Sequence, residues 1–335
     1  MNRKIVLIVL TALALISTGC AKKSHVIKSI AIIGAPESAV LVGEKFSLNV
    51  DISPEDADAR AVVWSSSDPA VAKVNADGHV LATGGGECEI SATAGKASDK
   101  VAISVNDRDP ARDEMGHVGT GKIERGRNNA FVTFSLGNTG WMGEILYQGG
   151  NNYVAYYDNG TFNASWNGTN DYILGIGYYY VKDSDVDPED MQYDCYFRHT
   201  RTGSAGGYSY IGLHGWTMDP LVEFYIVDDW YNKPGVNLLG QKKGEFTVDG
   251  TKYEIYQNQR VQQPSITGTQ TYPQYFSVRT VARQSGHIDA SAHFKNFETL
   301  GMRMGKMYEL MYFIEVGGGT GSLECTYFFM SDGTF

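Results

Sequence analysis

The sequence is poor in cysteine and in positive charge, and each shortage excludes a class of protein. Its 335 residues include only 4 Cys, none spaced like the ligands of a zinc cluster, so a disulfide scaffold and a zinc finger are both excluded. There are 28 Lys and Arg against 38 Asp and Glu, and the formal net charge is −10. Because a protein that binds a phosphate backbone needs basic patches, no nucleic-acid partner is expected.

Glycine and aromatic residues are plentiful instead. The chain has 39 Gly, 21 Tyr, 14 Phe and 5 Trp but only 9 Pro, and 42% of its residues are hydrophobic. This mixture favours twisted, aromatic-faced β-sheet with many tight turns. The length allows two domains, each large enough to bury its own core.

The N-terminus has the pattern of an export signal over residues 1–19. A short basic start at residues 2–4 precedes an apolar run from Ile5 to Ile16 and a small-residue end at residues 17–20. The ending Gly-Cys resembles a bacterial lipoprotein signal, which implies that Cys20 is acylated and becomes the new N-terminus. An ordinary secretory signal is the alternative, because Ser17 stands where Leu is commoner. Either signal places the mature protein outside the cytoplasm.

No second apolar run of about 20 residues follows, so any membrane attachment is expected to be by lipid. The anchored protein would lie on the periplasmic face or at the cell surface. Of the remaining cysteines, Cys88 alternates with Ile90 and Ala92 and is expected to be buried in a strand. Cys195 and Cys325 could pair, and their spacing leaves this open.

Residues 26–105 alternate with period two, as half-buried antiparallel strands do. Short turn signals separate the strands, which predicts a small β-sandwich. The segment resembles the bacterial Ig-like group 2 domain in Val42-Gly43-Glu44, Val63 to Ala72, Asp77 to Val80 and Ile90 to Ala92. The resemblance implies a spacer or adhesive module whose partner is unknown, with Trp64 in its core.

Residues 106–114 hold six charged side chains in nine residues and predict a linker to a domain over residues 115–335. Just beyond it, Gly116 to Lys122 mimics a phosphate loop, but Ile123 stands where a hydroxyl residue is needed. The sequence has no His-Glu-x-x-His pair and no Gly-x-Ser-x-Gly elbow. We therefore expect no cofactor and no metal.

The second domain is again dominated by strands rich in Tyr, Phe and Val. The expected strands are Glu144–Tyr147, Tyr153–Tyr157, Thr161–Trp166, Tyr208–His214, Leu221–Val227, Lys252–Gln259, Tyr275–Arg283, Tyr308–Glu315 and Ser322–Phe329. Residues 290–301 are the exception, with Phe294, Phe297 and Leu300 at helical spacing before a glycine. The expected fold class is all-β: an Ig-like β-sandwich followed by a β-jelly roll with a single α-helix.

Two glutamates lie in strands that are otherwise apolar. Glu223 interrupts the run Leu221–Val227, and Glu315 closes the run Leu310–Ile314. A carboxylate in such a strand is costly unless it has a partner or chemical work to do. An ion pair with an arginine is one explanation. The other is glycoside hydrolysis, which needs one ionised and one protonated carboxyl group.

A resemblance to glycoside hydrolase family 11 favours the second explanation. It runs in unbroken order over roughly 190 residues, through Gly215 to Val227, Tyr253 to Tyr256, Gln259 to Thr269, Gln274 to Arg279, His293-Phe294 and Gly305 to Glu315. This family comprises retaining endo-β-1,4-xylanases on a jelly roll with one helix. The resemblance implies that xylan is the substrate, Glu223 the nucleophile and Glu315 the general acid/base. Retention implies carboxyl groups about 5–5.5 Å apart.

Further contacts with the substrate follow by position from the same resemblance. Tyr225 is expected to touch the sugar beside the nucleophile, and Arg260 and Gln274 to hydrogen-bond the sugar and Glu223. Pro264 begins Pro264-Ser265-Ile266, the expected tip of a mobile thumb that closes over the chain and excludes water.

Two aromatic residues are expected to present flat faces to the sugar rings. Trp166 matches a tryptophan on the side of the cleft, and Tyr147 stands in the place of a tryptophan that stacks on sugar. Packing within the sheet is the alternative for both residues.

At two positions the residue type bears on the pH dependence. His214 stands where the family usually has a tyrosine that touches the nucleophile, and we expect it to donate a hydrogen bond to Glu223 and to add a pH dependence near neutrality. Asp171 stands where the family has Asn or Asp beside the acid/base. In that family the Asp form goes with acidic pH optima, so the resemblance implies an acid-shifted pH profile, and the coupled titration of two neighbouring carboxyls is consistent with it.

Two other functions compete with the xylan-cleaving enzyme. A non-catalytic, glycan-binding jelly roll would not need Glu223 and Glu315, and both are present. An adhesin would depend on the Ig-like domain, and a single such domain before a much larger cleft domain fits that function poorly.

Overall fold

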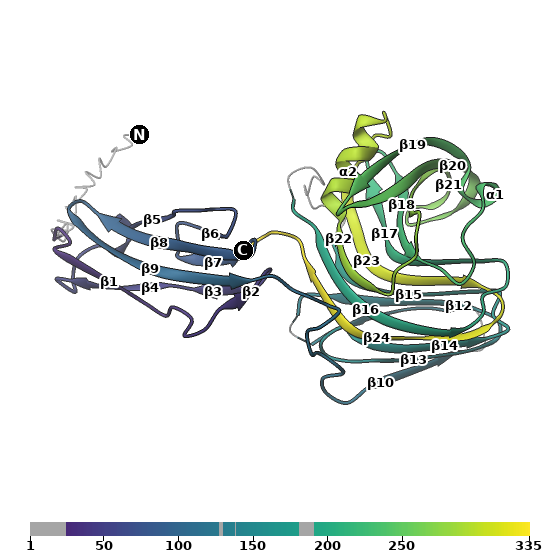
Figure 1. Cartoon of the computed structure of the whole chain (residues 1–335), viewed down its shortest axis with the longest axis horizontal. Coiled ribbons are helices and arrows are strands. Elements are labelled where there is room, and N and C mark those ends of the chain that lie inside the picture. Colours follow the sequence, from purple (N-terminus) through teal and green to yellow (C-terminus); the bar gives the residue numbers. More distant parts are fainter. Residues whose placement is uncertain (1–24, 127–129, 138, 181–190) are drawn as a thin grey trace, which may run out of the picture.

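The computed structural model describes residues 25–126, 130–137, 139–180 and 191–335. The expected signal over residues 1–19 and Cys20 lie outside these residues. The described chain forms two bodies side by side along its long axis, a small N-terminal one and a larger C-terminal one (Figure 1). No helix in the described ranges combines the length and the apolar character needed to cross a membrane.

The N-terminal body is built from short strands, as the period-two pattern predicts. It contains a two-stranded sheet of β1 (Ser29–Ile33) and β4 (Asn49–Ser53), and a four-stranded sheet in the order β2 (Val40–Leu41), β9 (Ala97–Asn106), β8 (Gly86–Ala94) and β5 (Val63–Ser66). A three-stranded sheet follows the order β3 (Lys45–Ser47), β7 (His79–Ala82) and β6 (Ala72–Val74). One 3₁₀ turn, η1, spans Ala59–Ala61. Leu48, Val80 and Ile90 are buried in its core, and Trp64 packs against them partly buried.

The C-terminal body consists of two large sheets. The first is ordered β10 (Lys122–Gly126), β13 (Asn151–Tyr156), β14 (Phe162–Asn167), β24 (Thr320–Ser331), β16 (Asp194–Gly203) and β22 (Ser285–Asp289). The second is ordered β11 (Ala130–Ser135), β12 (Met142–Gln148), β15 (Asp171–Tyr179), β23 (Lys306–Gly317), β17 (Tyr208–Met218), β18 (Val222–Asp229), β21 (Gly268–Arg279), β20 (Thr251–Ser265) and β19 (Gln241–Val248). The all-β fold class is confirmed.

Alternation along the strands separates the core of this body from a cleft. In β23 the side chains of Leu310, Tyr312 and Ile314 pack into the core between the two sheets. Because successive side chains of a strand point to opposite faces, the residues between them lie on the other face of the nine-stranded sheet. That face carries Glu315 and lines the cleft described below.

The expected helix over residues 290–301 is α2 (Ala290–Thr299). The Asp289 carboxylate caps its N-terminus by accepting a hydrogen bond from the Ala292 backbone N–H, 3.0 Å away. Phe294 and Phe297 are buried against the core, and Gly301 ends the segment at a φ of 71°. The other α-helix of the described chain, α1 (Val236–Leu239), is a single turn.

The charged segment over residues 106–114 is packed rather than free. Arg108 is only 8% exposed, and its Nε donates to the Val42 carbonyl oxygen at 2.6 Å. The guanidinium lies 3.5 Å from the centroid of the Phe329 ring in the C-terminal body. Further along, Arg198 donates from Nη1 to the Pro110 carbonyl oxygen at 2.8 Å. The segment therefore bonds to both bodies instead of separating them.

The three described cysteines are buried and free. Cys88 lies in the core of the N-terminal body, as the alternation predicts, and Cys195 and Cys325 lie between the two large sheets. The possible Cys195–Cys325 disulfide is not present in the structure.

Candidate active site

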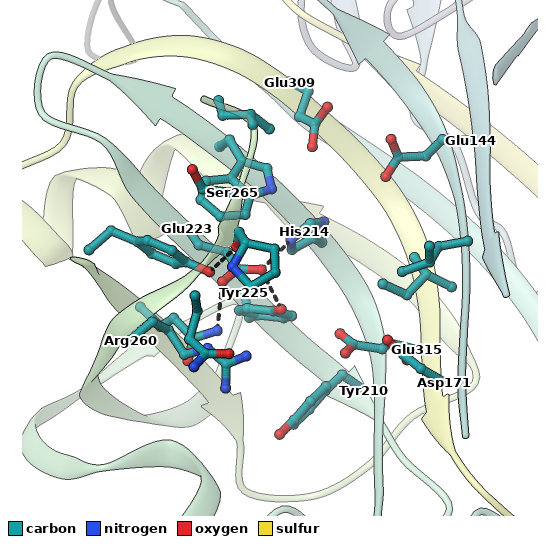
Figure 2. Close-up of a pocket in the computed structure, with 18 of the residues that line it drawn as sticks. Glu144, Asp171, Tyr210, His214, Glu223, Tyr225, Arg260, Ser265, Glu309 and Glu315 are labelled. Carbon is teal, nitrogen blue, oxygen red and sulfur yellow. Dashed lines mark hydrogen bonds and ion pairs between the residues drawn. The ribbon is translucent and has the colours of Figure 1, made fainter. Parts of the chain in front are cut away.

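A cleft of about 870 Å³ lies along the face of the nine-stranded sheet that points away from the core (Figure 2). Glu223 and Glu315 both line it, although they lie far apart in the sequence. They reach it from β18 and β23, the two strands that flank β17. Glu223 lies opposite Trp216 of β17, and Glu315 lies opposite Tyr210.

Three side chains hold the Glu223 carboxylate. Its Oε1 accepts hydrogen bonds from the Tyr225 hydroxyl at 2.8 Å and from His214 Nε2 at 3.2 Å, and its Oε2 accepts one from Gln274 Nε2 at 2.6 Å. Asn258 Nδ2 in turn donates to the Gln274 side-chain oxygen at 3.1 Å. Burial opposes ionisation, but the hydrogen bond and charge of His214, with Gln274 and Tyr225, hold the pKa of Glu223 below its usual value.

The pKa of the Glu315 carboxyl is shifted in the opposite direction from that of Glu223. Burial raises its pKa well above the usual value, and the neighbouring carboxylates of Asp171 and Glu223 raise it further. Its Oε2 atom is buried and finds no hydrogen-bond partner in the described chain. One carboxyl group of the cleft is therefore disposed to be ionised and another to hold a proton.

Asp171 lies in β15, beside the strand that carries Glu315. Its Oδ1 accepts a hydrogen bond from the Tyr208 hydroxyl at 2.9 Å. Burial, together with the charge of Glu223, raises the pKa of Asp171 despite this bond. Since Ile173 lies opposite Glu315, Asp171 is two residues along the same face, and its charge raises the pKa of the Glu315 carboxyl.

The hairpin of β20 and β21 forms one wall of the cleft. Pro264, Ser265 and Ile266 at its tip line the cleft, as does Arg260 further down β20. The Tyr272 hydroxyl donates to the Pro264 carbonyl oxygen at 2.7 Å, and Ser265 Oγ donates to the Gly268 carbonyl oxygen at 2.6 Å. These bonds close the tip of the hairpin on itself.

A second group of polar side chains lies in the same cleft. Glu144, His214 and Glu309 each bring one potential ligand atom within 4.8 Å of the other two, and all three are buried. Burial is the main cause that raises the pKa of both Glu144 and Glu309. Of the described residues, these three alone could jointly hold a metal ion.

Comparison with known proteins agrees with this geometry. The sequence model of glycosyl hydrolases family 11 matches residues 141–326, which include every cleft residue described so far. The chain belongs to this family. Residues 28–105 match the bacterial Ig-like domain (group 2).

Several relatives of the family 11 domain are named for xylan cleavage. An endo-1,4-beta-xylanase C of Fibrobacter succinogenes is 58% identical over 224 residues, which are 67% of this chain and 37% of that protein. An endo-1,4-beta-xylanase A of a Piromyces species is 40% identical over 190 residues, 56% of this chain and 30% of that protein. The chain thus spans about a third of the length of each of these two relatives.

Solved structures show the same fold. The crystal structure of the wild-type ENZbleach xylanase superposes with a TM-score of 0.61 at 33% identity, covering 68% of this chain and 93% of that one. A triple mutant of the same enzyme gives a TM-score of 0.62 at 33% identity over 68% of this chain and 91% of that one.

The family 11 cleft brings together most of the residues expected from the sequence but not Tyr147 and Trp166. Tyr147 points from β12 into the core, so that Leu146 and Gln148 line the cleft in its place. Trp166 is 2% exposed in β14 of the six-stranded sheet, where its Nε1 donates to the Ser204 carbonyl oxygen at 3.2 Å. Both side chains pack within the protein, and the structure gives their predicted stacking on sugar no support.

Other cleft residues were missed from the sequence. Tyr208, Tyr210, Glu144 and Glu309 line the cleft and were not among the expected site residues. For Glu309 a signal exists: it lies an even number of positions before Glu315 in one strand, so both must point to the same face. A buried glutamate in an apolar strand was the argument for Glu315, and it holds equally for Glu309.

Proposed function

We propose that this protein is a retaining endo-1,4-β-xylanase that hydrolyses internal bonds of xylan by double displacement. The observation that carries the proposal is the pair of acids in one cleft, with the pKa of Glu223 lowered and that of Glu315 raised. Membership of glycosyl hydrolases family 11 and the names of the relatives supply the substrate. No cofactor is part of the proposal.

In the first displacement Glu315 acts as the acid and Glu223 as the nucleophile. The Glu315 carboxyl gives its proton to the oxygen of the scissile glycosidic bond as that bond breaks. The ionised Glu223 carboxylate attacks the anomeric carbon and forms a covalent glycosyl-enzyme ester. Tyr225, His214 and Gln274 orient Glu223 for this attack through their hydrogen bonds.

In the second displacement Glu315 acts as a base instead of an acid. Now ionised, it takes a proton from a water molecule, whose oxygen attacks the same anomeric carbon and releases Glu223 as a carboxylate. The product keeps the configuration of the substrate, and Glu315 has regained its proton. Both acids end the cycle in the states in which they began.

Other cleft residues are assigned to substrate binding. Tyr225 and Arg260 lie on the wall beside Glu223, and Gln274 is shared between Glu223 and the sugar. Pro264, Ser265 and Ile266 form the tip of the thumb, which closes over the sugar chain and excludes water during the reaction. Asp171 tunes the titration of Glu315.

The function is tested by measuring reducing ends released from xylan and from cellulose by the full chain. Release from xylan alone is expected, and it should be lost in Glu223→Gln, whose amide keeps the shape of the side chain but cannot attack. Binding of xylan without release of reducing ends would favour the glycan-binding jelly roll instead.

The mature protein is proposed to be exported and held at a membrane by a lipid on Cys20, on the periplasmic face or at the cell surface. The apolar run before Gly19-Cys20 supports this proposal. The test compares the parent with Cys20→Ala in cells fed a labelled fatty acid. Label in the parent alone, with the parent in the membrane fraction, is expected. An unlabelled parent would leave the ordinary secretory signal.

A further inference from the structure

Two carboxylates and one imidazole nitrogen converge within the cleft that also holds Glu223 and Glu315. Glu144 reaches this point from β12, His214 from β17 and Glu309 from β23, with one ligand atom of each within 4.8 Å of the others. The three residues are 7%, 5% and 3% exposed, respectively. Figure 2 shows the carboxylates of Glu144 and Glu309 turned toward each other above His214.

These groups lack the partners that buried polar atoms usually have. Within the part of the chain that the structure describes, neither the Glu144 nor the Glu309 carboxylate takes part in a hydrogen bond or an ion pair. The Nδ1 atom of His214 is likewise buried without a partner. Two adjacent, largely buried acids repel each other when both are ionised, and either protons or a bound cation relieve that repulsion.

The hydrogen bond of His214 determines what its free nitrogen can do. A carboxylate oxygen only accepts hydrogen bonds, so Nε2 carries the proton that it donates to Glu223 Oε1. A metal ion would bind the neutral form of the ring, in which the Nδ1 atom has no proton and presents a lone pair toward the two glutamates. A histidine that binds a metal through one nitrogen commonly donates its other N–H to a carboxylate, and His214 is arranged in this way.

We propose that Glu144, His214 and Glu309 bind one divalent transition-metal ion of the Zn²⁺ type. One oxygen of each glutamate and Nδ1 of His214 supply three ligands, and the open side of the cleft leaves room for water as a fourth. Ligand bonds of about 2.1 Å place ligand atoms about 3.4 Å apart, so the side chains need to close in by only about 1–1.5 Å. A set of two carboxylates and an imidazole suits Zn²⁺ or Mn²⁺ better than Ca²⁺ or Mg²⁺, which prefer oxygen alone.

The site has a consequence for catalysis that rests on the proposed function. The ion would occupy the cleft next to the nucleophile, because His214 bonds to Glu223 on one side and to the ion on the other. Sugar and metal would then compete for the same space. Zn²⁺ should therefore inhibit xylan cleavage reversibly, and a chelator should restore it.

The direct test measures uptake of Zn²⁺ alone, without xylan, by the full chain after treatment with a chelator. Titration calorimetry should give one ion per chain in the parent and at least tenfold weaker binding in Glu144→Gln and in Glu309→Gln. Glu245→Gln, which removes an exposed carboxylate of β19 in the same body, is the matched control and should bind as the parent does. Circular dichroism checks that each variant is folded. If one glutamine variant fails to fold, the other alone still tests the site.

The two proposals fail in distinguishable ways. A parent that takes up no Zn²⁺, or folded glutamine variants that bind it as tightly as the parent, would overturn the metal site. Cleavage of xylan in the presence of the chelator is measured separately and tests the proposed function alone.

Discussion

The Nε2 atom of His214 lies 3.2 Å from Oε1 of Glu223, and the same oxygen accepts a hydrogen bond from the Tyr225 hydroxyl. Both donors reach Glu223 from the cleft face of neighbouring strands, β17 and β18. The carboxylate proposed as the nucleophile is thus oriented by its own sheet before any sugar enters the cleft. Each bond stabilises the ionised form of the carboxylate in a buried setting.

Replacing His214 by phenylalanine removes the hydrogen bond to Glu223 and keeps an aromatic ring at this position. A hydrogen bond to a charged group contributes about 1.5–3 kcal/mol, so His214→Phe should lower kcat/KM on xylan by about 10- to 100-fold. His214→Tyr restores a donor at the position and should retain activity at or above that of the parent. Steady-state kinetics of both variants make the comparison. Complete loss in the tyrosine variant would contradict the role given to this position.

Asp171 should set the alkaline limit of the pH profile. The Asp171 and Glu315 carboxyls interact, and both have raised pKa values, so they lose their protons in two coupled steps as the pH rises. Once Asp171 is ionised, its charge holds the proton more tightly on Glu315, which becomes a weaker acid toward the leaving group. Asp171→Asn removes the ionisation of Asp171. The alkaline limb of the activity profile should therefore move to higher pH by on the order of one pH unit.

The measurement for Asp171 is the pH dependence of kcat/KM in parent and variant. Asp158→Asn is a suitable control, because Asp158 is half exposed and pairs with Lys122 away from the cleft. An alkaline limb that stays in place in Asp171→Asn would show that the two carboxyls do not titrate as a pair.

Arg108 should stabilise the two bodies against each other. Its buried guanidinium stacks on Phe329 and bonds to the Val42 carbonyl oxygen, so Arg108→Ala should cost about 2–4 kcal/mol of stability. Arg112→Ala in the same segment removes an exposed ion pair with Asp109 and should cost less than about 1 kcal/mol. Denaturant unfolding measures both values, and equal costs would argue against the packed interface.

The charge pattern of residues 106–114 did not predict that this segment packs against the two bodies. Six charges in nine residues predict a solvated segment, and most of these residues are indeed accessible. Arg108 is buried because an aromatic ring from the last strand of the chain covers it. No local pattern contains that partner, so the sequence predicts where the segment lies but not that it packs.

Glu223 and Glu315 could be singled out from the sequence because each lies in an otherwise apolar strand, and both side chains line the cleft. Tyr147 was assigned to the cleft by the family resemblance, whereas alternation along β12 places it with Ile145 on the core face and Glu144 on the other. Trp166 was misplaced for a different reason. Its strand joins the six-stranded sheet, and the local pattern of a strand does not say which of two sheets it joins.

Several strands were not expected at all, among them β15, β16 and β19. Each has glycines or charged residues within it, which weaken a prediction based on β-branched and aromatic content. Pairing with neighbours on both sides stabilises β15 and β16 nonetheless. Because Asp171 begins β15, its place beside Glu315 depended on the family resemblance and not on a predicted strand.

The central claim, that Glu223 is the nucleophile of a double displacement, is tested most directly by trapping the covalent intermediate. An activated 2-fluoro xylobioside forms the glycosyl-enzyme but slows its hydrolysis, so intact-protein mass spectrometry should show one added glycosyl unit. Peptide mapping should place that unit on Glu223, and Glu223→Gln should acquire none. A label on another residue, or an active parent that never acquires one, would contradict the account.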